Sequence, residues 1–186
     1  MTSLRRGRDQ PGDQQLAESK SELQRALNAT IDLEINHPNI PKYYRLKKEL
    51  NECLALVLHR RGDLAESDTR FDRATQMQRL LIAHAEAPER HRPWLYYLQV
   101  RHGRMLVEAD EHRRAEELLK NAASKLERAF EQLPKHHDRN SFIAFNRIFI
   151  EQYLDLAYRS LATLSEELGN AEGAQDWNQK LDKLRG

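Results

Sequence analysis

The sequence has a single cysteine and almost no excess of either charge, and each of these features excludes some kinds of site or function. Because Cys53 is the only cysteine in 186 residues, the chain forms no internal disulfide and no cysteine-rich zinc site. Its 30 Lys and Arg residues are balanced by 29 Asp and Glu, a formal net charge of +1. A protein that binds nucleic acid mainly through the phosphates carries a large basic excess, which is missing here.

Long apolar runs are missing too. No window approaches 18 uncharged apolar residues, so we expect no membrane-spanning helix. The first residues, MTSLRRGRDQ, are basic but no apolar run follows them, which does not fit a secretory signal. We therefore expect a soluble, cytoplasmic protein without a membrane partner.

Motifs of catalysis and metal binding are absent as well. The sequence has no GxSxG elbow, no Walker A loop and no GxGxxG turn. No two histidines have the i, i+4 spacing of a helical zinc site, and the densest cluster, residues 136–138, is expected to be a solvated turn. No base is identifiable beside Cys53, so we expect a partly buried thiol there rather than a nucleophile. The protein is not expected to be an enzyme or to hold a cofactor.

What the sequence does contain is helix-forming residues. Leu, Ala, Glu, Arg and Gln predominate, valines number only three, and alternating strand patterns are absent. Gly62 and Gly169 stand where the ends of helices favour glycine, and prolines bracket the longer loops. The pattern predicts an all-α chain of about seven helices, at residues 13–36, 42–61, 64–87, 94–109, 112–133, 141–168 and 171–184.

The strongest signal is an internal repeat with an offset of 48 residues. The letters LAES at 16–19 recur at 64–67, and the last copy follows an insertion in the helix before it. Such a period is typical of stacked helical hairpins, each of which needs neighbours to bury its apolar faces. The repeated positions are Ser19, Leu23 and Ala26; Ser67, Phe71 and Ala74; Ala115, Leu119 and Ala122; and Ala174, Asn178 and Leu181.

These positions resemble the tetratricopeptide repeat. The second helix of that motif has a small residue, a large one four positions on and a small one three later, and its first helix has Leu-Gly or Leu-Ala, as at Leu54-Ala55 and Leu161-Ala162. The resemblance covers residues 13–184. It is greatest to the longer repeats, of about 50 residues, in arrays attached to some bacterial serine/threonine kinases. There a Pro and a Tyr precede the first helix, as they do in 41–44 and 93–97.

The resemblance implies a fold: antiparallel helical hairpins stacked as a right-handed solenoid. Residues 1–12 are then a flexible polar tail and 13–186 the repeat domain. A plain antiparallel helical bundle is the alternative interpretation of the same seven helices.

The resemblance also implies a function. The first helices of stacked hairpins line a concave surface, so we expect a scaffold or adaptor that binds a protein or peptide. Its arginines favour an acidic partner. The asparagines of the two-carboxylate clamp in chaperone-binding members are missing here, so that ligand is not implied. The expected groove residues are Glu49, Glu52, Leu56, His59, Arg60, Tyr97, Val100, Arg101, Arg104, Glu108, Arg159, Thr163 and Glu166.

Self-association is the alternative function. The predicted helix 141–168 is apolar on several sides, with Phe142, Phe145, Phe149 and Tyr153 on one face. Burial between two hairpins is the simpler interpretation. The other is that this helix forms a homo-oligomer or packs against further domains of a larger, kinase-linked protein.

RNA binding is the third class considered. Residues 90–104 combine four arginines with Trp94 and two tyrosines, and such a composition also occurs where aromatic rings stack on bases. The near-neutral chain favours the other interpretation, in which the rings pack between hairpins while the arginines face water.

Overall fold

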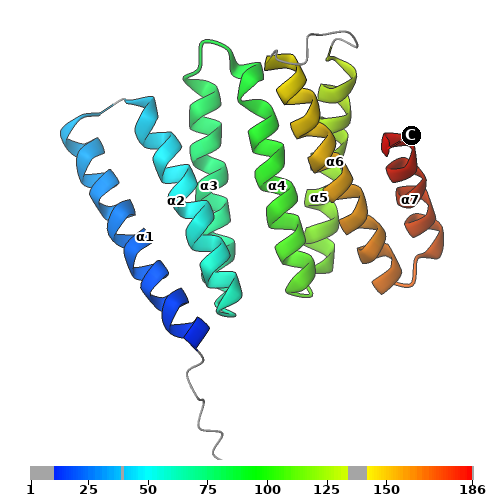
Figure 1. Ribbon diagram of the computed structural model, residues 1–186, viewed down its shortest axis with the longest axis horizontal. Coiled ribbons are helices and arrows are strands. Elements are labelled where there is room, and N and C mark those ends of the chain that lie inside the picture. The colour runs from blue at the N-terminus through cyan, green and yellow to red at the C-terminus, as the bar shows by residue number, and fades with distance from the viewer. Residues whose placement is uncertain (1–10, 39, 134–141, 186) are drawn as a thin grey trace, which may run out of the picture. The chain divides into compact units, whose positions relative to one another are not determined.

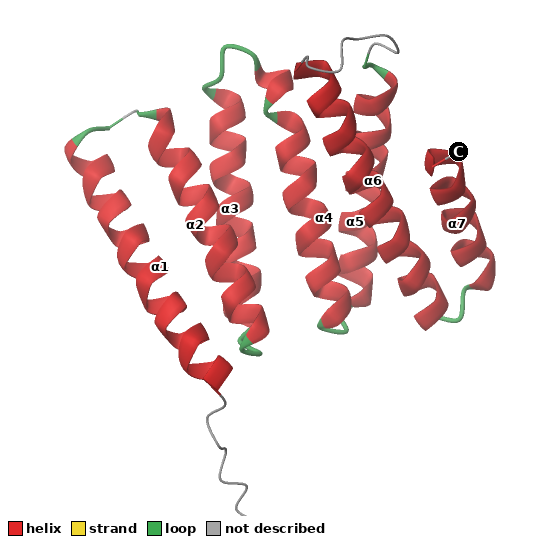
Figure 2. Ribbon diagram, viewed as in Figure 1, coloured by secondary structure: helices red, strands yellow, loops and turns green. Residues whose placement is uncertain are grey.

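A computed structural model describes residues 11–38, 40–133 and 142–185 of the chain. All regular secondary structure in these ranges is helical, as Figures 1 and 2 show. The elements are α1 (Pro11–Asn36), α2 (Pro41–Arg60), α3 (Leu64–Ala83), the 3₁₀ helix η1 (Pro88–Arg90), α4 (Arg92–Glu108), α5 (His112–Glu131), α6 (Phe142–Glu167) and α7 (Ala171–Arg185). The all-α prediction is confirmed for the described ranges. Residues 1–10 of the expected tail and the cluster at 136–138 lie outside them.

Prolines account for several of the boundaries. Pro41 opens α2 and Pro93 is the second residue of α4, where the missing amide hydrogen costs no helical hydrogen bond. The prediction for α3 was too long, because that helix ends at Ala83 and not at 87. Pro88 restricts the residue before it, and Ala87 is held at φ −127° and ψ 77°, outside the helical region.

Three of the turns between helices share one hydrogen-bonding pattern. Gly62, Asp110 and Gly169 have left-handed backbones, with φ of 81°, 59° and 71°. The amide of the residue after each one donates back to the carbonyl five residues earlier, which is the bond of a Schellman motif. These bonds are Asp63 to Leu58 at 2.9 Å, Glu111 to Leu106 at 2.8 Å and Asn170 to Ser165 at 2.8 Å.

The spacing of these turns matches the repeat found in the sequence. Gly62 and Asp110 are 48 residues apart, and Asp110 and Gly169 are 59 apart. The longer second interval agrees with the expected insertion, because α6 has 26 residues where α4 has 17. The hairpins α4–α5 and α6–α7 are therefore equivalent units of one pattern, and their members pack against each other.

The repeated small positions lie where paired helices meet. Ser67, Ala115 and Ala174 are all buried, and the Ser67 hydroxyl donates to the Ala55 carbonyl at 2.8 Å. Gly103 in α4 marks a close approach of two helices, since a Cβ built there would lie 2.6 Å from Cγ of Leu119 in α5. Small side chains at these positions thus set the distance between the helices of a pair.

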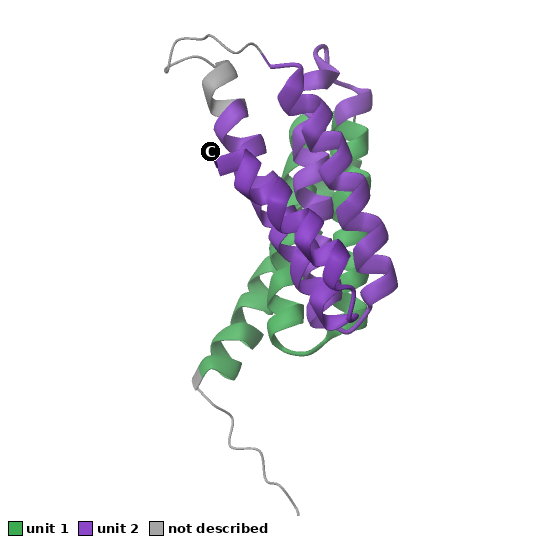
Figure 3. Cartoon of the chain, turned by 90° about the vertical axis from the view of Figure 1, so that its right-hand side faces the viewer, with its two compact units in different colours: residues 1–81 green, residues 82–186 purple. Residues whose placement is uncertain are grey.

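The described chain divides into two compact units, residues 1–81 and 82–186 (Figure 3). In the first unit, α1 packs on α2 through a cluster of Leu27, Leu50, Leu54 and Leu58. The first copy of the repeat departs from expectation, because Ala26 is exposed and Leu27, one position on, takes the buried place.

A buried arginine ties the three helices of this unit together. Arg70 in α3 donates to Gln24 Oε1 in α1 at 2.8 Å and to Asn51 Oδ1 in α2 at 3.5 Å. Glu66 accepts from Lys20 at 2.8 Å and lies 3.4 Å from Arg70. The hydrogen bond from Lys20, with help from Arg70, holds the pKa of the Glu66 carboxyl below its usual value.

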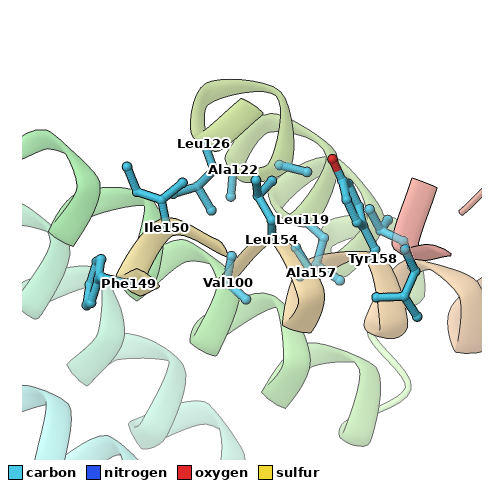
Figure 4. Packing of buried hydrophobic residues seen from close by; sticks show 12 residues of the cluster. Val100, Leu119, Ala122, Leu126, Phe149, Ile150, Leu154, Ala157 and Tyr158 are labelled. Atoms are coloured by element: carbon cyan, nitrogen blue, oxygen red, sulfur yellow. The ribbon is translucent and has the colours of Figure 1, made fainter. Parts of the chain in front are cut away.

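The second unit has the larger hydrophobic core. Figure 4 shows Leu119, Ala122 and Leu126 of α5 facing Ile150, Leu154 and Ala157 of α6. Val100 of α4 is fully buried in the same cluster, so its predicted place in a binding groove was wrong. A helical face that packs against the neighbouring hairpin belongs to the core. The sequence pattern alone does not distinguish this face from an adjacent face that lines a groove.

Helix α6 is covered on several sides within this unit. Phe149, Ile150, Leu154, Leu161 and Leu164 are all buried, which confirms the simpler of the two interpretations for these residues. Ile148 stays 56% exposed and Leu168, just after the helix, 52%. The side chains of the two phenylalanines predicted nearer the start of the helix lie outside the description.

None of the helices described is both long and apolar enough to cross a membrane.

Candidate functional site

A cleft of about 540 Å³ lies between α4 and α6 in the second unit. These are the first helices of two equivalent hairpins, and both end at turns on the same side of the unit, so they run parallel (Figure 1). Two apolar side chains, Val107 and Leu156, are among its lining, and the rest is polar or charged. The polar lining consists of Arg104, Glu108, Asp110, Arg159, Ser160, Thr163 and Glu167.

Aromatic packing fixes the two helices that form the cleft. Trp94 of α4 contacts Phe149 of α6 with ring centroids 4.4 Å apart, and Tyr97 meets Tyr153 edge-on at 4.6 Å. Farther along, Leu106 and Leu164 are buried in a second cluster with Ala115 of α5. The rings of the segment 90–104 therefore pack between hairpins, which is the interpretation that the neutral charge favoured.

Four of the predicted groove residues are brought together here. Arg104 and Glu108 come from α4, and Arg159 and Thr163 from α6. All four are exposed, as side chains available to a ligand must be. The parallel course of the two helices is what places residues 55 positions apart in the sequence around one cleft.

Besides the buried Val100, two predicted groove residues of α4 lie outside this lining. Arg101 donates to the Tyr97 hydroxyl, and its guanidinium stands 5.4 Å from the centroid of the same ring. Tyr97 in turn belongs to the aromatic contacts with α6. These two residues thus contribute to the packing of the helix pair.

The remaining predicted groove residues are on α2 in the first unit, with one exception on α6. Glu52 is buried, with 7% of its surface exposed, while Leu56 and His59 are half-buried and Arg60 is exposed. Glu49 is exposed as well. The exception is Glu166, which is exposed but does not line the cleft, whereas its neighbour Glu167 does.

Sequence reasoning missed several lining residues. Asp110, Ser160 and Glu167 were not expected, and neither were the apolar Val107 and Leu156. Glu167 was recoverable, since it lies eight residues, about two turns, after Arg159 on the same helical face. Asp110 was not, because it lies in the turn, where helical periodicity no longer applies.

An ion-pair cluster adjoins the cleft. Asp155 in α6 accepts from Arg159, with Nε to Oδ2 at 2.7 Å, and also from Arg185 of α7, with Nη2 to Oδ1 at 2.6 Å. Two guanidinium groups share one carboxylate, so the cluster keeps a net positive charge. Residue Arg185 comes from 30 positions away, and no local pattern reveals this partner.

A second polar cluster joins α5, α6 and α7. The Tyr158 hydroxyl donates to Glu127 Oε1 at 2.7 Å, and the Lys180 ammonium donates to the same oxygen at 2.8 Å. Lys180 also stands 4.9 Å from the centroid of the Trp177 ring. Burial, reinforced by the hydrogen bond to Glu127, raises the pKa of Tyr158 well above its ordinary value. This cluster closes one hairpin onto the next and is structural.

No group of three or more metal-ligating residues occurs in the described ranges. Cys53 is exposed on α2, so the expectation of a partly buried thiol was wrong. Its helix buries the face of Leu50, Leu54 and Leu58, and Cys53 falls on another face.

Comparison of the chain with protein-family models, with curated proteins and with solved structures found no match.

Proposed function

We propose that this protein is a non-catalytic protein-interaction module and that the cleft between α4 and α6 receives a segment of its partner. The observation that carries the proposal is the convergence of Arg104, Glu108, Arg159 and Thr163 on one cleft. Exposed charged side chains over the apolar Val107 and Leu156 combine the two features of a peptide-binding groove, orientation by polar groups and burial of apolar area.

The fold that we propose with this function is a tandem array of tetratricopeptide-like repeats, coiled as a right-handed solenoid. Support comes from the three equivalent turns at Gly62, Asp110 and Gly169 and from the packing of α4 on both α5 and α6. In stacked hairpins a first helix contacts its own partner and the first helix of the next hairpin, which is the pattern of α4.

A selection experiment tests the function without assuming a ligand. Short peptides displayed at random are selected on the immobilised protein, and the affinities of the best binders are measured by fluorescence anisotropy. We expect Thr163→Trp, which fills the cleft with an indole ring, to weaken binding at least about tenfold, a loss of ~1.4 kcal/mol.

The matched control is Ser124→Trp, which places the same ring on the exposed surface of α5. It should leave the affinities unchanged. Binders that are insensitive to Thr163→Trp, or a selection without any enrichment, would contradict the proposal.

Self-association through 141–168 has less support. Most apolar residues of α6 are used in the core of the second unit, and Ile148 and Leu168 are the large apolar residues that stay exposed among the described side chains of this segment. Two such side chains offer little area for a stable dimer, which typically buries about 800 Å² on each partner.

A further inference from the structure

The charges that line the cleft are separated along its length. On α4, Arg104 precedes Glu108, and Asp110 follows in the turn; on α6, Arg159 precedes Glu167. The two helices run parallel (Figure 1). Both arginines precede the carboxylates along their helices, so the arginines lie toward one end of the cleft and the carboxylates toward the other. The cleft thus has a basic pole and an acidic pole.

Backbone electrostatics strengthen the acidic pole. α4 ends at Glu108 and α6 at Glu167, so the carboxyl ends of both helices lie at that pole. The aligned peptide dipoles give the carboxyl end of a helix a partial negative charge, which adds to that of the carboxylates and favours a cation there.

The basic pole keeps its charge although Arg159 is paired. Asp155 is shared between Arg159 and Arg185, so one positive charge is left over in the cluster. If Arg159 turns to a ligand, Arg185 still neutralises Asp155, and no carboxylate is left unpaired. Arg104 is exposed and adds a second cation.

The distance between the poles defines the ligand. With a rise of 1.5 Å per residue, Arg104 and Glu108 are about 6 Å apart along α4, with Asp110 beyond them in the turn, and Arg159 and Glu167 are about 12 Å apart along α6. An extended chain advances about 3.3 Å per residue and its side chains alternate between two faces, so an acid and a base four residues apart share one face and span roughly 13 Å. The apolar floor of Val107 and Leu156 lies between the poles and suits an apolar side chain.

We propose that the cleft recognises an extended peptide segment with an acidic side chain, a basic side chain four residues from it and an apolar side chain midway between them, all on one face of the segment. The inference rests on the proposed function and specifies its partner. The family resemblance led us to expect an acidic partner, whereas the arrangement of charges selects one of mixed charge.

Four capped peptides test this inference. One carries Glu-Ala-Leu-Ala-Lys, and the others replace the charged pair by two Glu, two Lys or two Gln. In low salt, fluorescence anisotropy should show that the mixed peptide binds at least about tenfold tighter than the other three, because only it forms a favourable pair at each pole.

Variants of the poles sharpen the test. The double variant Arg104→Gln with Arg159→Gln removes the basic pole and should shift the preference to the peptide with two Lys. The double variant Asp110→Asn with Glu167→Gln weakens the acidic pole and should shift the preference to the peptide with two Glu. Asp155→Asn should strengthen binding of the mixed peptide about threefold, because it releases Arg159 from its carboxylate. Arg113→Gln, on the exposed surface of α5, is the control that should change nothing.

The outcomes separate this inference from the function on which it rests. Equal binding of all four peptides that is lost in Thr163→Trp would overturn the charge assignment while the cleft remained a binding site. Absence of binding by the mixed peptide would also overturn it. Binding that survives Thr163→Trp would overturn the proposed function itself.

Discussion

At the scale of single residues, the pair of Gly103 and Leu119 controls how closely α4 and α5 approach. A Cβ on Gly103 would lie 2.6 Å from Leu119 Cγ, and Leu119 is fully buried, so its side chain has no room to move aside. The glycine is therefore required by packing, although it costs the helix about 1 kcal/mol relative to alanine.

We predict that Gly103→Ala reverses its effect on stability when Leu119 is shortened. In the native background the clash should lower the free energy of unfolding by about 1–2 kcal/mol. In a Leu119→Ala background the clash is gone, and the same change should be neutral or raise stability by up to about 1 kcal/mol. Urea unfolding of the four proteins measures this cycle. Equal effects in the two backgrounds would show that the close contact does not exist.

Tyr158 gives a prediction about pH. Its pKa is raised above the ordinary value of 10.0, so the unfolded chain loses this proton at a lower pH than the folded one. The stability that this shift provides is complete below pH 10 and is lost as the pH rises toward the folded pKa.

Tyr158→Phe should therefore cost about 1 kcal/mol at pH 7, through loss of the hydrogen bond to Glu127, and progressively less above pH 10. The difference between the two proteins should shrink by up to about 1.4 kcal/mol for each pH unit above 10. Tyr43→Phe on α2 serves as the control for the general loss of stability in alkali. A difference that does not vary between pH 7 and pH 11 would contradict the prediction.

At the scale of elements, the backbone conformation of the turns follows the repeat more closely than the residues of the helices do. Gly62 and Gly169 occupy left-handed positions, and Asp110 occupies the equivalent one at a conformational cost. The left-handed turn is thus kept at Asp110, although the residue there is not a glycine.

Substitution should lower the free energy of unfolding at the two glycine turns and raise it at the Asp110 turn. Gly62→Ala and Gly169→Ala should each lower the free energy of unfolding by about 1 kcal/mol, because alanine is strained at positive φ. Asp110→Gly should instead raise it by a few tenths to about 1 kcal/mol. Thermal unfolding followed by circular dichroism distinguishes the signs. A loss of stability in Asp110→Gly as large as in the other two would argue against equivalent turns.

The elements were largely predictable because their signals are local. Pro41 and Gly62 act through the backbone at their own positions, so the limits of α2 follow from the sequence. The faces of the helices were harder, because Val100 and Glu52 lie on amphipathic helices whose buried side depends on which neighbour covers them. The pairing of Asp155 with Arg185 could not be predicted from the sequence, since it depends on how α7 packs back against α6.

At the scale of the whole molecule, the proposed stack of hairpins has a consequence for the chain in solution. A compact globule of 186 residues has a radius of gyration of about 16 Å. An open stack exposes more surface and should exceed that value clearly in small-angle X-ray scattering of a chain that begins at residue 11. A radius close to 16 Å would favour the closed bundle.

The whole-molecule view also explains the composition. Charged side chains of both signs are distributed over amphipathic helices, and within the cleft they separate into two poles. The net charge of +1 is a sum over the whole sequence, so it does not show that the charges lining the cleft are separated in space.

The most direct test of the central claim is an amide-resolved NMR titration with a peptide selected on the protein. It needs no assumption about where the ligand binds. The account predicts that the largest shift changes fall in residues 104–110 of α4 and its turn and in 156–167 of α6, and that Thr163→Trp abolishes them. Shift changes centred on α1 or α2 instead, with residues 104–110 and 156–167 unaffected, would contradict it.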